Sequence, residues 1–211
     1  MKKTFLVLSI FILLTACSKD SSLERRLAHL LANVNEKEKL GTSYVRKLNQ
    51  REQKEQQLFS DTMELTQQQY TEVRKLVTAL KKSANERMVI IDKEQQALRD
   101  ARMELKYFQE LMGGVDGEYI EKVEKVQNAL LDRYDAHDRF VSDYKELINE
   151  QIILYTELED RTIRLRVLDD QVNEVNRLTS VVERDLHEFN EATTEVNRLK
   201  SRVFASLEKI K

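Results

Sequence analysis

Cys17 is the only cysteine of the chain and its most distinctive reactive side chain. It directly follows Leu14, Thr15 and Ala16, and the segment from Phe5 to Leu14 is apolar except for Ser9. Two lysines precede this apolar run, and a positive start, a short apolar run and small residues before a cut site are typical of a secretory signal peptide. Ten residues rise only about 15 Å as a helix, about half of the hydrocarbon thickness of a bilayer. We therefore expect a cleaved signal and not a membrane span.

The four residues that end at Cys17 resemble the bacterial lipobox, in which the cysteine sulfur receives diacylglycerol and the preceding bond is cut. A buried free thiol, the alternative, would leave the charge, the apolar run and the small residues unexplained. We predict a signal peptide over 1–16, an acylated Cys17, a tether over 17–22 and a helical domain over 23–211. Two or three acyl chains hold a protein stably in lipid, so the expected location is the extracytoplasmic face of the cell membrane. An outer-membrane location is the alternative, because Ser18 stands where an aspartate is associated with retention in the inner membrane of two-membrane bacteria.

No other part of the sequence predicts catalysis. The chain lacks a His-Glu-x-x-His pair, a Gly-x-Ser-x-Gly turn, a phosphate-binding loop and a dinucleotide fingerprint. His187 has Glu183 and Glu191 four residues to either side, which predicts a solvated charged line more than a metal site. His137 falls on a core row, and we expect it to bond to a neighbouring helix instead of acting as a metal ligand or pH switch. The prediction is a protein without enzymatic activity, cofactor or metal.

The composition indicates a helical chain. There is no proline, and the sequence holds only four glycines, whereas both helix breakers are common in average proteins. Without residues 1–16, 33 basic side chains stand against 37 acidic ones, so bulk charge would draw in neither nucleic acid nor another anionic polymer.

Three breaks divide the chain into predicted helices of roughly 23–58, 62–112, 117–160 and 164–210. Three glycines between Met112 and Gly117 mark the clearest turn. Asp61 with Glu64 resembles a capping box and predicts the first break. The heptad frame slips by three residues near 160–163, which indicates a turn or a distorted helix there.

Apolar residues within these helices repeat every seven residues in two rows. The second helix carries Tyr70, Val77, Ala84, Ile91, Leu98, Leu105 and Met112 on one row and Val73, Leu80, Arg87, Glu94, Ala101 and Phe108 on the other; the last helix carries Leu168, Val175, Val182, Phe189, Val196, Val203 and Ile210 with Val172, Thr179, Leu186, Thr193, Lys200 and Leu207. Arg87 and Glu94 are either buried polar residues that fix the helix register or part of a ligand site, and the first is the commoner use. The fold class is therefore all-α, a long, coiled-coil-like, antiparallel up-and-down four-helix bundle. A three-helix form, continuous across residue 160, is the alternative.

Arg161, Arg164 and Arg166 gain importance from this topology. With Cys17 in lipid, the first and third turns lie far from the membrane, so these arginines would form the distal tip, while Lys209 and Lys211 would lie near the headgroups. Guanidinium groups suit phosphate and carboxylate recognition. The alternative is that the three arginines pair with the acidic residues Glu157, Glu159 and Asp160.

The sequence also resembles the YkyA-like cell-wall-binding lipoproteins of Gram-positive bacteria. The resemblance rests on the lipobox and on Glu86-Arg87, Ile91-Asp92-Lys93-Glu94, Arg133-Tyr134, Asp135-Ala136-His137, Tyr144 and Leu154-Tyr155. It implies a four-helical up-and-down bundle and supplies no catalytic or binding residue. The expected function is a membrane-anchored surface lipoprotein whose projecting rod binds cell-wall polymer or an envelope protein. The alternative is an envelope scaffold or adaptor that pairs with partner helices.

Overall fold

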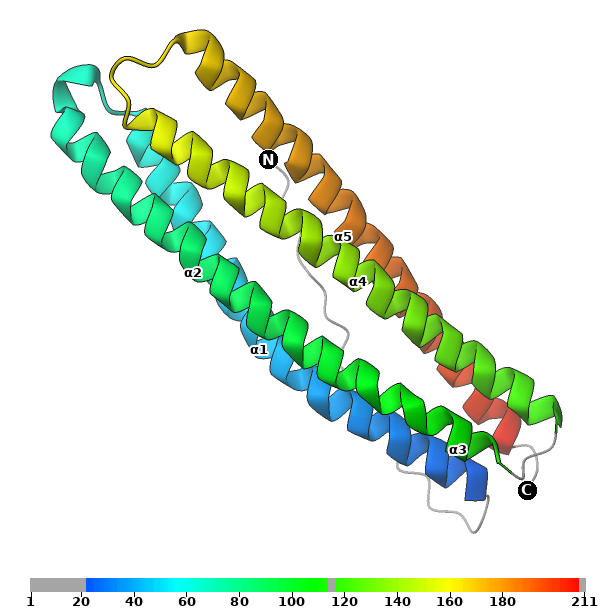
Figure 1. Cartoon of the computed structure of the whole chain (residues 1–211). Helices are drawn as coiled ribbons and strands as arrows, with labels where there is room; N and C mark the ends of the chain where they lie inside the picture. The colour runs from blue at the N-terminus through cyan, green and yellow to red at the C-terminus, as the bar shows by residue number, and fades with distance from the viewer. Residues whose placement is uncertain (1–21, 114–116, 209–211) are drawn as a thin grey trace.

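The computed structural model describes residues 22–113 and 117–208 as a helical bundle (Figure 1). Its elements are α1 (Ser22–Met63), the 3-10 turn η1 (Gln67–Gln69), α2 (Tyr70–Arg102), the 3-10 segment η2 (Met103–Tyr107), α3 (Phe108–Met112), α4 (Gly117–Leu158) and α5 (Leu165–Leu207). The predicted all-α, antiparallel up-and-down bundle is confirmed. The signal peptide 1–16, Cys17, most of the tether, and Lys209 and Lys211 lie outside the described residues.

Two helical hairpins build the bundle. The chain runs up α1 and down α2, η2 and α3, then up α4 and down α5, and α2 packs against α4 to join the hairpins (Figure 1). We call the end that holds the first turn of α1 and the last turn of α5 the proximal end. The opposite end, which holds the turns after α1 and after α4, is the distal tip.

The heptad rows of the second predicted helix form the core of the bundle. Its buried members are Val77, Leu80, Ala84, Arg87, Ile91, Glu94, Leu98, Ala101, Leu105 and Phe108. The core has a proximal cluster with α1 residues up to Val34 and a distal cluster that begins with Leu48 in α1. Both clusters lie entirely within residues 23–207, so the segment 18–211 holds the whole described core and folds without the signal peptide.

Gly41 lies in α1 where that helix packs tightly against α2. A Cβ at this position would stand 2.8 Å from Cδ1 of Leu98, closer than two carbon atoms pack. The missing side chain allows the two helices to approach each other here.

The predicted first break was wrong by about five residues. Asp61 lies inside α1, where its Oδ1 accepts a hydrogen bond from Gln57 at 2.7 Å, so it does not cap a helix. The turn follows Met63, and the backbone N–H of Thr66 donates to Oε1 of Gln69 at 3.0 Å. Thr66 and Gln69 form the capping box that closes the turn.

The predicted helix 62–112 is not continuous. Its last part passes through η2, and Leu105, Phe108 and Leu111 are buried there. Leu105 lies in η2 and the other two lie in α3. The three residues per turn of the 3-10 segment bring Phe108 onto the same face as Leu105, and Leu111 follows one turn later. Leu111 is therefore buried where the heptad row predicted Met112, which is only half-buried.

The question of a break near residue 160 is settled in favour of a full turn. α4 ends at Leu158 and α5 begins at Leu165, so the three-helix alternative is wrong. The first turns of α5 pack loosely: Val172, predicted in the core, is 37% exposed, whereas Val182, Phe189, Val196 and Val203 further along α5 are buried.

Candidate binding surface at the distal tip

The turn between α4 and α5 is fixed by short polar contacts of its own. Oδ1 of Asp160 accepts hydrogen bonds from the backbone N–H and the hydroxyl of Thr162, both at 2.7 Å. These bonds lower the pKa of the Asp160 carboxyl, because they favour its charged form. Arg164 is extended, with φ −80° and ψ 134°, and directly precedes α5. The turn thus presents its side chains on an ordered backbone.

Arg161 lies against the neighbouring hairpin. Its guanidinium carbon stands 5.0 Å from the ring centroid of Tyr70, the first residue of α2, in a cation–π contact. The Tyr70 hydroxyl donates to the carbonyl of Glu159 at 2.9 Å. Lys81 of α2 reaches the Glu159 carboxylate at 2.7 Å. One hairpin therefore positions the turn of the other.

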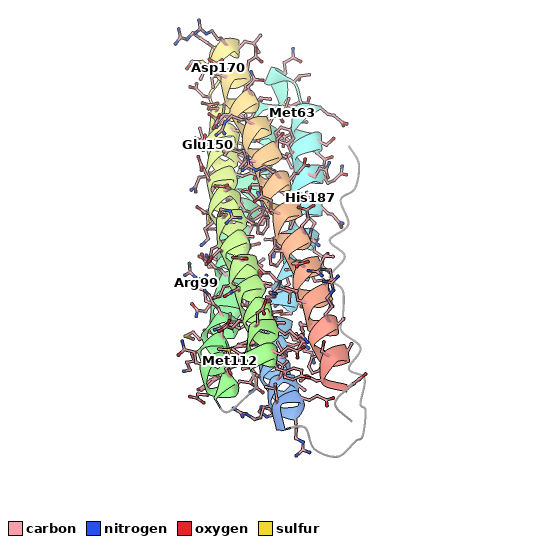
Figure 2. All side chains as sticks on the ribbon, turned by 90° about the vertical axis from the view of Figure 1, so that its right-hand side faces the viewer. Met63, Arg99, Met112, Glu150, Asp170 and His187 are labelled. Carbon is pink, nitrogen blue, oxygen red and sulfur yellow. The ribbon has the colours of Figure 1, made fainter. Side chains whose placement is uncertain are left out.

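Arg164 and Arg166 extend into solvent. Both residues are exposed, and the Arg166 side chain is 93% exposed with Nε 3.8 Å from Asp170. Figure 2 places Asp170 and Met63 at the same end of the bundle.

The alternative that the three arginines pair with nearby acidic residues does not hold. Within residues 22–113 and 117–208, none of the three arginines pairs with Glu157, Glu159 or Asp160, since Glu159 binds Lys81 and Asp160 binds Thr162. Burial and the nearby Glu150 instead raise the pKa of Glu157 above its usual value. The guanidinium groups of the tip are thus not neutralised by the three carboxylates of their own turn, although Arg166 lies near Asp170.

Apolar side chains accompany these arginines. Leu165 is 72% exposed and Val167 is 36% exposed, and Met63 at the end of α1 is 57% exposed. The sequence analysis did not select them. Leu165 lies one heptad before Val172 on the second row of the last helix, whereas Val167 lies off both rows. The arrangement can bind phosphate or carboxylate groups through guanidinium and offers apolar contact beside them.

The polar residues of the core form a separate, buried network with no access for a ligand. The Arg87 guanidinium binds the Glu55 carboxylate through Nε at 2.9 Å and Nη2 at 2.6 Å, and it also donates to Tyr144 at 3.1 Å and Gln151 at 2.6 Å. Burial lowers the pKa of Arg87, but Tyr144 and Glu55 outweigh it and raise that pKa above its ordinary value. The Tyr155 hydroxyl completes the network with a 2.8 Å bond to Glu55. Arg87 is therefore a buried polar residue that links three helices, as predicted.

The predicted histidine roles are also observed. Nε2 of His137 lies 2.9 and 3.0 Å from the two carboxylate oxygens of Glu94 on α2, and both residues are buried. His187 is exposed and pairs with Glu191 at 3.2 Å. In the part of the chain that the structure describes, no three His, Cys, Asp or Glu residues come close enough to hold a metal ion. The same residues include no helix long and apolar enough to cross a bilayer.

The fold and the tip define a class: an elongated helical bundle with three arginines and exposed apolar side chains at its distal end. A family model described as "Putative cell-wall binding lipoprotein", YkyA, matches residues 22–206. The chain belongs to this family.

Two individual proteins are also similar. The "Uncharacterized lipoprotein YkyA" of Bacillus subtilis (strain 168) is 23% identical over 194 residues, which cover 92% of this chain and 86% of the relative. A 1.6 Å crystal structure of a conserved protein of unknown function from Staphylococcus aureus superposes with a TM-score of 0.76 at 16% identity, over 85% of this chain and 91% of that chain. This likeness supports the fold, and the family membership identifies a lipoprotein.

Proposed function

We propose that the protein is a non-enzymatic surface lipoprotein, anchored through acylated Cys17, whose rod binds cell-wall polymer at the distal tip. The family is one of lipoproteins, and Cys17 ends a lipobox-like run. The 42 residues of α4 rise about 63 Å at 1.5 Å per residue. Because α1 starts at the proximal end, an anchor before it leaves the tip as the part furthest from the membrane.

One observation carries the proposed contact site. Arg161, Arg164 and Arg166 lie at the tip, and none of them pairs with the three acidic residues beside them. Guanidinium groups bind phosphate and carboxylate oxygens in bidentate fashion, and both groups occur in wall polymers. These guanidinium groups would have to make the contact individually, because the whole mature chain carries slightly more acidic than basic residues.

Cosedimentation of the segment 18–211 with purified wall sacculi tests this proposal. The triple variant Arg161→Glu, Arg164→Glu, Arg166→Glu should lose most of the wall-bound fraction at low salt. A matched control reverses three exposed basic residues away from the tip, Lys39→Glu, Arg46→Glu and Lys82→Glu, and should keep it. Equal losses in both variants, or no binding by the unmodified segment, would rule out a tip site for wall polymer.

The adaptor function is the second candidate, and the exposed apolar residues of the tip favour it. Leu165 and Val167 beside arginines provide the composition of a protein interface core. The double variant Leu165→Ser, Val167→Ser separates the two functions. It should leave wall binding unchanged if guanidinium groups alone make the contact, and it should abolish copurification of an envelope protein if the adaptor function is correct.

A further inference from the structure

A second solvent-accessible site lies at the proximal end, between the first turns of α1 and the segment formed by η2 and α3. It is a groove of about 580 Å³, lined by Arg25, Arg26 and His29 of α1 and, across from them, by residues that include Glu104, Tyr107, Glu110 and Leu111. This volume falls in the range of about 300–1,000 Å³ that small-molecule sites occupy. In Figure 2, Met112 marks this end, beside the start of α1.

The groove has one cationic wall. Arg25, Arg26 and His29 lie on exposed turns of α1. Arg26 donates through Nη2 to the backbone carbonyl of Glu110, which fixes this guanidinium at the edge of the groove, and that bond uses one of its five N–H donors. On the opposite wall, Glu104 binds Lys37 at 2.7 Å. Glu110 also lines the groove. Arg25, Arg26 and Lys37 stand against Glu104 and Glu110, so these five side chains carry one net positive charge.

The opposite wall also presents an amphipathic ring. The 3-10 path of η2 buries Leu105 and leaves Tyr107 40% exposed and Met103 58% exposed. The ammonium group of Lys106 lies 4.8 Å from the centroid of the Tyr107 ring. Exposed tyrosine next to basic side chains is the combination that proteins place at the boundary between water and lipid.

The position of the groove agrees with this chemistry. Four residues lie between Cys17 and Ser22, the first residue of α1, and the five Cα-to-Cα steps of a fully extended chain would span about 18 Å. Arg25 and Arg26 follow within the first two turns of α1. A lipid anchor at Cys17 would thus hold the groove near the headgroup layer.

We propose that this groove binds the phosphate of an anionic phospholipid headgroup in the membrane that carries the anchor, with Arg25, Arg26 and His29 as its ligands and Tyr107 against the glycerol region. The position of the groove rests on the proposed anchor, whereas its chemistry does not. Headgroup binding holds the proximal end of the bundle directly against the membrane surface, in addition to the tether.

Vesicle cosedimentation tests the groove without the anchor. The segment 18–211, which lacks Cys17, is mixed at low salt with vesicles of phosphatidylglycerol in phosphatidylcholine and with pure phosphatidylcholine vesicles. We expect binding to the first and little to the second. The variant Arg25→Gln, Arg26→Gln should lower binding about 30-fold, since each basic residue near an anionic surface contributes about 1 kcal/mol.

Three further measurements complete the test. Arg25→Lys, Arg26→Lys keeps the charge and should retain most binding, and Tyr107→Ala should weaken it. Lys122→Gln, Lys125→Gln removes two paired charges in the first turns of α4 at the same end and should have little effect. Equal binding to both vesicle types, or equal losses in the α1 and α4 variants, would overturn the groove proposal. Wall binding by the tip is measured without lipid, so the two proposals fail separately.

Discussion

The Arg87–Glu55 ion pair allows a quantitative test of how the distal half of the bundle is held together. Both side chains are buried, with 3% and 4% of their surface exposed, and two nitrogen–oxygen contacts join them. Arg87→Met keeps an elongated side chain but leaves the Glu55 carboxylate buried without its cation. Loss of one member of a buried pair costs about 3–5 kcal/mol, so the free energy of unfolding should fall by that amount.

Urea unfolding of the segment 18–211, followed by circular dichroism at 222 nm, measures this change. For a domain of this size, the melting temperature should fall by roughly 6–20 °C. The double variant Glu55→Gln, Arg87→Met removes both charges and keeps an acceptor for the Tyr155 hydroxyl. It should recover about 2 kcal/mol relative to the sum of the single changes. A loss below about 1 kcal/mol for Arg87→Met, or strictly additive losses, would refute the view that this pair is coupled in the core.

Three other perturbations follow from the described contacts. Gly41→Leu should lower the free energy of unfolding by about 1–3 kcal/mol because it overpacks the α1–α2 contact, and adding Leu98→Ala should restore part of it in the same urea assay. A hydrogen bond to Asp185, burial and charge repulsion raise the pKa of Asp143 to about 6. Because folding favours the protonated form, the free energy of unfolding should decline from about pH 4 to pH 7, by less than about 1 kcal/mol since solvent screens the pair. Asp143→Asn should flatten this slope. Burial lowers the pKa of Lys200 to about 8, so its charged form destabilises the fold below that pH. Lys200→Met should raise the melting temperature at pH 7, and this increase should shrink as the pH approaches 10. An unchanged melting temperature at pH 7 would contradict the prediction.

The helical fold was predictable because its signals are periodic. The heptad rows that contain Val77, Arg87 and Glu94 identify the buried face of α2 correctly, since burial of an apolar stripe determines how long helices pair. The position of the first turn was not predictable, because two pairs match the capping pattern: Asp61 with Glu64, and Thr66 with Gln69. Only the packing of α1 on α2 decides between them.

The surfaces were predictable only in part. The three arginines of the tip are visible in the sequence, but their spatial relation to Tyr70 and to exposed Leu165 depends on how two hairpins meet. The proximal groove had no sequence signal, since Arg25 and Tyr107 are 82 residues apart and the 3-10 path of η2 breaks the heptad frame.

The arrangement of two hairpins with the first turn of α1 and the last turn of α5 at the proximal end (Figure 1) has a mechanical consequence. A pulling force applied between Ser22 and Arg164 runs parallel to the helix axes, because these residues lie at opposite ends of the bundle. The helices must then slide past one another, so the contacts of both core clusters resist together instead of opening one at a time. The bundle should therefore resist tension along its length between these two residues better than tension across it.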